Sequence, residues 1–189
     1  MYRSYQSIST SQDALDMLKK GNERYLSGDL SDKSDYAAER EVLSRGQHPY
    51  AIVLACSDSR TPPEIFFDQK LGDLFTIRNA GNIADDSAIG SIEFAVSVLK
   101  VPLITVVGHN ECGAVLAAYQ NIGASGKLKV VLDSIKPALE GSKDENEAIN
   151  ANIINTVNKI KENNVVKEHH TAVLGAHYNI KTGVVNWVV

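Results

Sequence analysis

The two cysteines of the chain, Cys56 and Cys112, are the residues best suited to chemistry. Cys56 ends a short apolar run and is followed at once by Asp58 and Arg60. Cys112 comes after a second apolar run, and His109 stands three residues before it. Thiolates and imidazole are ligands that zinc prefers, and residues three apart on a helical turn face the same way. We therefore expect Cys56, His109 and Cys112 to bind a zinc ion.

This set of three ligands leaves a fourth coordination position free, which is the pattern of catalytic zinc sites. Asp58 can reach the metal or its bound water, and Arg60 can hold that carboxylate in a bidentate pair. Three other interpretations are weighed against this one. A lone cysteine on a buried strand is usually a core residue, an exposed ion pair contributes little, and a redox pair lacks the Cys-x-x-Cys spacing. The combination of all these residues at strand ends favours metal binding.

The elements that would position these residues form an alternating pattern. Apolar runs at 51–56, 74–78 and 102–107 predict strands buried on both faces, and 171–176 predicts a fourth strand. Helical spacing of apolar residues predicts helices at 85–99, after residue 112 to about 121, at about 128–139 and at about 145–163. Such alternation predicts a parallel sheet, with 184–189 as an antiparallel edge strand. Because loops at the carboxyl ends of parallel strands converge, Cys56 should meet His109 and Cys112.

Residues 1–46 differ from the rest, because they predict helices without strands. A capping box from Ser9 to Gln12 begins a helix at about 10–27, and a shorter helix at roughly 36–45 is closed by Gly46. The apolar residues of the first helix must find a partner elsewhere, often on another subunit. We expect a single α/β domain over 1–189, with a central mostly parallel β-sheet flanked by helices. Within it, 1–46 is a helical arm and 47–189 the α/β core.

Composition limits the partners and the location. The chain has 189 residues and a net charge of -4, without a basic stripe that would indicate nucleic acid. No apolar run approaches the roughly 18 residues of a membrane span, and the first residues lack the apolar core of a signal peptide. We therefore expect a cytoplasmic protein that binds neither nucleic acid nor membrane. In a reducing compartment its cysteines are better suited to metal binding or catalysis than to a disulfide.

Two segments resemble the signature segments of the β-class carbonic anhydrases. They are Cys56-Ser-Asp58-Ser-Arg60 and Gly108-His109-Asn-Glu-Cys112-Gly113. Further similarity lies in the first predicted helix, in the loop that follows the second predicted strand, and near the C-terminus. The quoted segments there are Leu18-Lys-Lys-Gly21-Asn22-Glu-Arg24-Tyr25, Gly72-Asp73-Leu-Phe-Thr-Ile-Arg78-Asn79-Ala-Gly81-Asn82 and Gly175-Ala-His-Tyr-Asn-Ile-Lys-Thr-Gly183. The resemblance covers nearly the whole chain.

The resemblance implies zinc on Cys56, His109 and Cys112, with Asp58 and Arg60 as a catalytic dyad. It implies reversible hydration of carbon dioxide to bicarbonate and a proton by zinc-bound hydroxide. Asp58 would be a conditional fourth zinc ligand in a closed resting state, from which Arg60 draws it away. The resemblance also implies a homodimer or homotetramer, with the N-terminal helices lying across the partner subunit.

Three alternative functions remain at this point. The first is a zinc hydrolase on the same scaffold that acts on carbon disulfide or carbonyl sulfide. The second is a non-catalytic protein that binds zinc or bicarbonate as a sensor, although such a binder would not need the Asp58–Arg60 pair. The third is a structural zinc protein with a permanently closed fourth position.

Overall fold

A five-stranded sheet in the order β2-β1-β3-β4-β5 forms the centre of the molecule. The computed structural model describes residues 8–189. The strands are β1 (Ala51–Cys56), β2 (Leu74–Asn79), β3 (Leu103–His109), β4 (Ala172–Tyr178) and β5 (Val185–Trp187). The first four pair in parallel, and β5 pairs antiparallel to β4. The predicted α/β fold with a mostly parallel sheet is therefore confirmed.

The strands differ in burial because they differ in their place in the sheet. Every residue of β1 and β3 is buried, as the unbroken apolar runs predict. The same prediction is wrong for β2, whose residues are only half-buried and whose Arg78 is exposed. This strand lies at one edge of the sheet, next to β1 alone, so that only part of its surface is covered within the chain.

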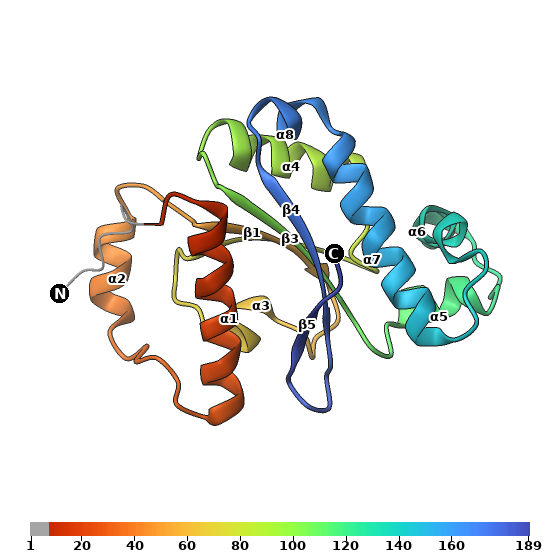
Figure 1. Cartoon of the computed structure of the whole chain (residues 1–189), viewed down its shortest axis with the longest axis horizontal. Helices are drawn as coiled ribbons and strands as arrows, with labels where there is room; N and C mark the ends of the chain where they lie inside the picture. Colours follow the sequence, from red (N-terminus) through yellow and green to blue (C-terminus); the bar gives the residue numbers. More distant parts are fainter. Residues whose placement is uncertain (1–7) are drawn as a thin grey trace.

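Helices cover both faces of the sheet (Figure 1). On one face α4 (Asp86–Ser97) packs on β1 and β2, and α7 (Glu145–Glu162) packs on β3 and β4. Beside α7 lie α5 (Gly113–Tyr119), α6 (Gly126–Ile135) and the 3-10 helix η2 (Lys136–Leu139). The helix predicted at 128–139 is thus divided, at a point where Pro137 cannot continue regular hydrogen bonding. A further short helix, α8 (Asn164–Glu168), has no counterpart among the predicted elements.

The opposite face of the sheet is covered by α1 (Ser11–Ser27) and α3 (Pro63–Phe66). α1 begins after Thr10, whose side chain accepts a hydrogen bond from the Asp13 N–H, so the predicted capping box at Ser9 is wrong by one residue. Ala14 and Leu18 of α1 are fully buried in one cluster with residues of β1 and β3. The apolar side of α1 therefore finds its partner within the same chain. By contrast α2 (Tyr36–Leu43), which the structure describes in full, has no buried residue.

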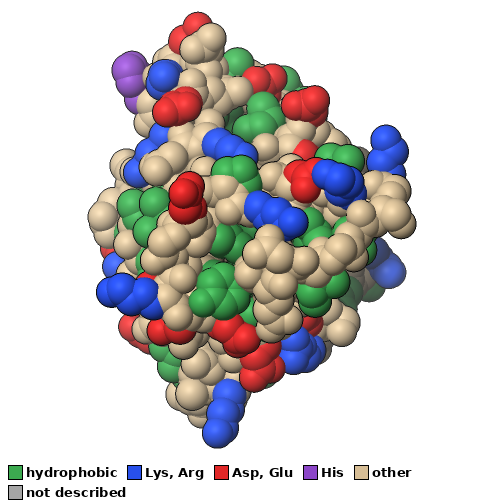
Figure 2. Space-filling view, turned by 90° about the vertical axis from the view of Figure 1, so that its right-hand side faces the viewer, with side chains coloured by type: hydrophobic (Ala, Val, Ile, Leu, Met, Phe, Trp, Pro, Cys, Tyr) green, Lys and Arg blue, Asp and Glu red, His purple; other side chains and the backbone are tan. Residues whose placement is uncertain are grey.

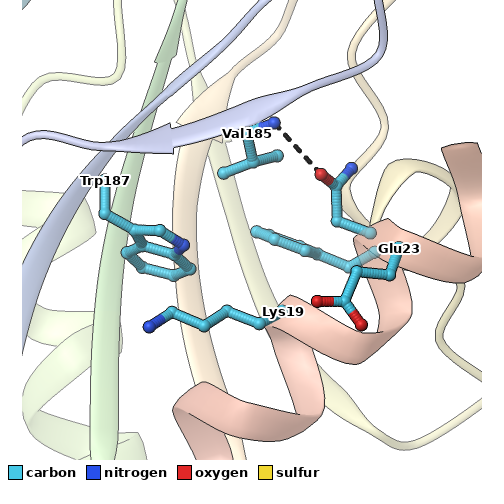
Figure 3. A pocket seen from close by; sticks show the side chains of 6 residues that line it. Lys19, Glu23, Val185 and Trp187 are labelled. Atoms are coloured by element: carbon cyan, nitrogen blue, oxygen red, sulfur yellow. Dashed lines mark hydrogen bonds between the residues drawn. The ribbon is translucent and has the colours of Figure 1, made fainter.

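Polar contacts fix α1 to the C-terminal hairpin. The Asn22 side chain donates hydrogen bonds to the carbonyls of Phe66 and Gly183, and its oxygen accepts one from the Val185 N–H. Figure 3 shows this last bond beside a pocket of about 210 Å³ between α1 and β5. There the ammonium group of Lys19 lies 5.9 Å from the ring centroid of Trp187. The N-terminal helix is thus joined to the last strand of the sheet.

The surface on the side of α5 and α6 is mixed in character (Figure 2). On the side of the molecule that carries α5 and α6, acidic and basic side chains are interspersed with hydrophobic ones (Figure 2). Leu128 and Val130 of α6 are among the exposed hydrophobic residues. Within residues 8–189, no helix combines the length and the apolar character that crossing a membrane requires.

Candidate metal centre

The carboxyl ends of β1 and β3 bring the three predicted ligands together. Cys56 is the last residue of β1, His109 is the last residue of β3, and Cys112 is the N-cap of α5. All three side chains are buried, and their ligand atoms lie within 4.8 Å of one another. The convergence of strand ends expected from a parallel sheet therefore occurs here.

The distance between the two sulfurs fits a tetrahedral metal ion. Cys56 and Cys112 are free thiols with their Sγ atoms 3.8 Å apart. Two sulfurs bonded to zinc at about 2.3 Å in tetrahedral geometry would be about 3.8 Å apart, whereas a disulfide needs about 2.05 Å. The two thiols are therefore spaced as zinc ligands.

The His109 ring is oriented for the same purpose. Its Nδ1 lies 2.8 Å from the Asn110 carbonyl oxygen, which can only accept a hydrogen bond. In the neutral ring the proton is then on Nδ1, and the Nε2 lone pair is free. Nε2 is buried and has no hydrogen-bond partner among the described residues. A buried polar atom without a partner is unfavourable unless something binds it, and a metal ion among these donors would do so.

The thiols influence each other strongly. The contact between the Cys56 and Cys112 sulfurs lowers the pKa of Cys56, and the hydrogen bond from the Gly81 N–H adds to this effect, whereas burial opposes it. The same contact, together with burial, raises the pKa of Cys112. Because zinc binds cysteine as the thiolate, a metal that binds both residues must displace any proton that they hold.

Asp58 and Arg60 lie directly beside the three ligands. Asp58 Oδ1 accepts hydrogen bonds of 2.9 Å from both the backbone N–H and Nε of Arg60, and Oδ2 accepts one of 2.8 Å from Nη2. Asp58 Oδ2 is also 4.0 Å from His109 Nε2. The hydrogen bonds from Arg60 lower the pKa of Asp58 well below its usual range, so the carboxylate stays ionised. The predicted ion pair between Asp58 and Arg60 is therefore present, and its carboxylate lies beside His109 Nε2, the candidate ligand nitrogen.

Sequence reasoning did not assign a role to Arg78, which holds the turn between Cys56 and Asp58. Its Nε donates to the Cys56 carbonyl at 3.0 Å and its Nη2 to the Asp58 carbonyl at 2.6 Å. Arg78 stands one residue before the end of β2, and the register pairs Cys56 with Asn79. The sequence offers one signal for this role, a charged residue at the end of the apolar strand predicted at 74–78.

The loop after β2 also reaches the ligands. Its backbone adopts positive φ angles, 76° at Gly81 and 45° at Asn82. The Gly81 N–H lies 3.5 Å from Cys56 Sγ and donates to it. The Gly81 carbonyl in turn accepts a 2.8 Å hydrogen bond from Asn152 of α7. Nothing in the sequence near Asn152 indicated this contact, because it joins residues far apart in the chain.

The family model for carbonic anhydrase (Pro_CA) matches residues 51–185. The chain is 45% identical over 126 residues to carbonic anhydrase 2 of Mycobacterium tuberculosis, covering 65% of this chain and 61% of that protein. It is 43% identical over 126 residues to a carbonic anhydrase of Mycolicibacterium smegmatis, with the same coverage. The alignments therefore span about three fifths of the length of these relatives.

Solved structures agree with the sequence comparison. The β-carbonic anhydrase CafA of Aspergillus fumigatus is 29% identical, with a TM-score of 0.73 over 82% of this chain and 86% of that chain. The β-carbonic anhydrase CcaA is 26% identical, with a TM-score of 0.72 over 94% of this chain and 91% of that chain. Because the family model covers most of the chain and includes all three candidate ligands, the chain belongs to the β-class carbonic anhydrase family.

Proposed function

We propose that the protein is a zinc-dependent carbonic anhydrase that interconverts carbon dioxide and bicarbonate. The observation that carries this proposal is the buried group of Cys56, His109 and Cys112 with the Asp58–Arg60 pair beside it. The names of the relatives support the same reaction, and the family model supports the same scaffold. A structural zinc site would need a fourth permanent protein ligand, and Asp58 has both oxygens bonded to Arg60.

In this proposal Cys56, His109 and Cys112 hold the zinc ion. Zinc bound there supplies the Lewis-acid activation of water that hydration of carbon dioxide requires. His109 binds through Nε2 because its Nδ1–H is held by the Asn110 carbonyl. Burial of all three side chains keeps bulk water away from the donor atoms.

Asp58 orients the reacting water molecule, and Arg60 orients Asp58. An ionised carboxylate accepts hydrogen bonds only, so Asp58 fixes which way a neighbouring water directs its protons. Its Oδ2 is beside His109 Nε2, within one water's reach of the ligand group. Arg60 keeps that carboxylate ionised and in place. In a closed state Asp58 would bind the zinc ion through Oδ2, the oxygen that lies nearest His109 Nε2 and that also accepts the hydrogen bond from Arg60 Nη2.

We further propose that the protein assembles as a homodimer or homotetramer, with α2 packing on a partner subunit. The absence of buried residues throughout α2, and the half-buried edge strand β2, leave surfaces that a second copy would cover. Two β-carbonic anhydrases from Sordaria macrospora, one of which is 25% identical with a TM-score of 0.72, are tetrameric. The division into a 1–46 arm and a 47–189 core remains part of this proposal. We also propose a cytoplasmic location, because two free cysteines are suited to a reducing compartment.

The test is stopped-flow hydration of carbon dioxide by protein of measured zinc content, from about pH 6.5 to about pH 9. Zinc lowers the pKa of its bound water, but less strongly where two thiolates cancel the charge of the ion, so the range extends well above pH 7. We expect about one zinc per chain and hydration that rises with pH. Cys56→Ser is the matched control, which should lose both zinc and hydration. Zinc without hydration, or turnover of carbon disulfide or carbonyl sulfide alone, would overturn the assignment to carbon dioxide.

A further inference from the structure

Asn152 is a polar side chain on the buried side of α7. Its neighbours on that side are apolar or small, and Asn152 itself is 1% exposed. The Nδ2 group donates to the Gly81 carbonyl at 2.8 Å, while Oδ1 has no hydrogen-bond partner among the described residues. Burying an amide with half of its polar atoms unpaired is unfavourable for folding. Asn152 therefore needs an explanation other than core packing.

The contact that Asn152 makes leads directly to the candidate metal ligands. Gly81 is the residue whose N–H donates to Cys56 Sγ. Its positive φ of 76° suits glycine, and a Cβ there would lie 2.7 Å from Ile135 Cδ1 and 3.3 Å from Ala114 Cβ. Glycine is also the residue with the greatest backbone freedom. Anchoring the Gly81 carbonyl therefore limits the rotation that would turn its N–H away from Cys56.

The next residue of α7 supports the second ligand-bearing segment. A Cβ on Gly108 would lie within 2.7 Å of Ile153 side-chain atoms, so Ile153 fills the space beside the residue that precedes His109. Two adjacent residues of α7 thus contact both ligand-bearing regions. Asn152 bonds to Gly81, whose N–H donates to Cys56, and Ile153 lies beside Gly108, which precedes His109. Ile153 does this by packing, whereas Asn152 does it by a directed hydrogen bond.

We propose that Asn152 is a positioning residue for the metal centre, which keeps the Gly81 N–H on the Cys56 thiolate and so sets its strength as a metal ligand. A hydrogen bond to a ligand sulfur changes the electron density that the sulfur gives to the metal. Partners in the surroundings of a metal typically change its affinity by about 10-fold to 100-fold when they are mutated. This inference rests on the proposed zinc site but not on the identity of the substrate.

The experiment compares the wild-type protein with Asn152→Leu, which keeps the bulk and removes the donor. Val157→Ala is the matched control, because Val157 is fully buried on the same helix and packs against Gly175 of β4 instead. Zinc affinity is measured by competition with a chelator, and the near-ultraviolet thiolate-to-cobalt charge-transfer band is recorded after cobalt is loaded into the metal-free protein. We expect Asn152→Leu to weaken zinc binding about 10-fold to 100-fold and to shift the band.

Val157→Ala should lower the melting temperature but leave the zinc affinity and the band unchanged. Wild-type affinity and an unshifted band in Asn152→Leu would overturn the proposal, as would an equal shift in Val157→Ala. If Asn152→Leu does not fold, Asn152→Ala carries the same comparison without adding bulk. Zinc binding without hydration in the wild-type protein would overturn the proposed function alone, whereas failure to bind either metal would overturn both.

Discussion

Asp58 is the residue at which metal binding and turnover should separate. It lies outside the group of three ligands, yet its Oδ2 is 4.0 Å from the ligand nitrogen of His109. We expect Asp58→Asn to keep about one zinc per chain and to lose about 10²-fold to 10⁴-fold in hydration rate, the usual range for a positioned proton acceptor. Zinc analysis and stopped-flow hydration of the same sample test this. Full activity in Asp58→Asn would remove Asp58 from the mechanism.

A second carboxylate, Asp68, has a structural effect that depends on pH. Its side chain is fully buried and accepts hydrogen bonds from Arg24, Lys33 and Ser31, which join α1 and the segment after it to the core. Burial alone would raise the pKa of Asp68, but Lys33, Ser31 and Arg24 together lower it from 3.8 to about 2. A lowered pKa stabilises the folded state above the unfolded value of 3.8, and this contribution is lost as pH falls toward 2.

Asp68→Asn should therefore destabilise the protein only where the wild-type carboxylate is ionised. We expect a loss of about 2 to 4 kcal/mol at pH 7, between the value of a charged hydrogen bond and that of a broken buried ion pair. The difference in unfolding free energy between the two proteins should shrink as pH falls from about 4 to about 2. Urea unfolding over this range tests it, with the exposed Asp29→Asn as control. A difference that is constant with pH would contradict this assignment.

At the residue scale, the candidate ligands could be predicted from the sequence, whereas the residues that bond to the backbone around them could not. Cys56, His109 and Cys112 are recognisable because cysteine and histidine are rare at the ends of apolar runs, and Asp58 is recognisable because it follows Cys56 so closely. Asn152 and Arg78 donate hydrogen bonds to backbone carbonyl groups, and no sequence motif marks such a contact. Asparagine and arginine are common residues, and only the folded arrangement shows which backbone group each one meets.

At the scale of elements, contacts between helices decide what a glycine does. Alanine has a higher helix propensity than glycine by about 1 kcal/mol, so propensity alone predicts that Gly21→Ala in α1 and Gly90→Ala in α4 both stabilise the protein. A Cβ at Gly21, however, would lie 1.8 Å from the backbone oxygen of Phe67. At Gly90 it would meet no heavy atom of residues 8–189 within 4 Å. The two substitutions should therefore have opposite effects.

We expect Gly90→Ala to raise the unfolding free energy by about 0.5 to 1 kcal/mol, and Gly21→Ala to lower it by about 1 to 3 kcal/mol or more. The loss arises because α1 must move away from α3, and backbone atoms cannot rearrange as a flexible side chain can. Denaturant unfolding of both variants measures the difference. Equal stabilisation of the two would show that α1 does not approach α3 this closely.

The elements themselves were largely predictable, because apolar runs and helical periodicity are local signals. Most of the errors concern what the rest of the fold places around an element. The apolar run at 74–78 predicts a strand buried on both faces, because such a run does not reveal that β2 lies at the edge of the sheet. The helix predicted at 128–139 continued through Pro137, where α6 gives way to a 3-10 helix. The place of α1 on its own sheet could not be predicted, because an apolar stripe does not specify which surface covers it.

The whole molecule offers a direct test of assembly. Tyr36 and Val42 are exposed hydrophobic residues of α2, and we expect them to be covered in a homodimer or homotetramer. Sedimentation equilibrium of the wild-type protein should give a multiple of the 20.5 kDa chain mass. Replacing both residues with lysine should lower that mass, whereas Leu128→Lys with Val130→Lys on α6 should not. A wild-type protein that sediments as a monomer would contradict the proposed assembly.

Metal removal should change the stability of the whole molecule, because the ligands come from β1, β3 and the start of α5 and bind together only in the folded state. A ligand present at 1,000 times its dissociation constant stabilises the folded state by about 4 kcal/mol. For a chain of this length that corresponds to a rise of about 8 to 16 °C in melting temperature. Scanning calorimetry with zinc and with a chelator measures it. Cys112→Ala should show no such difference, and equal melting temperatures for the wild-type protein would contradict a metal centre at this site.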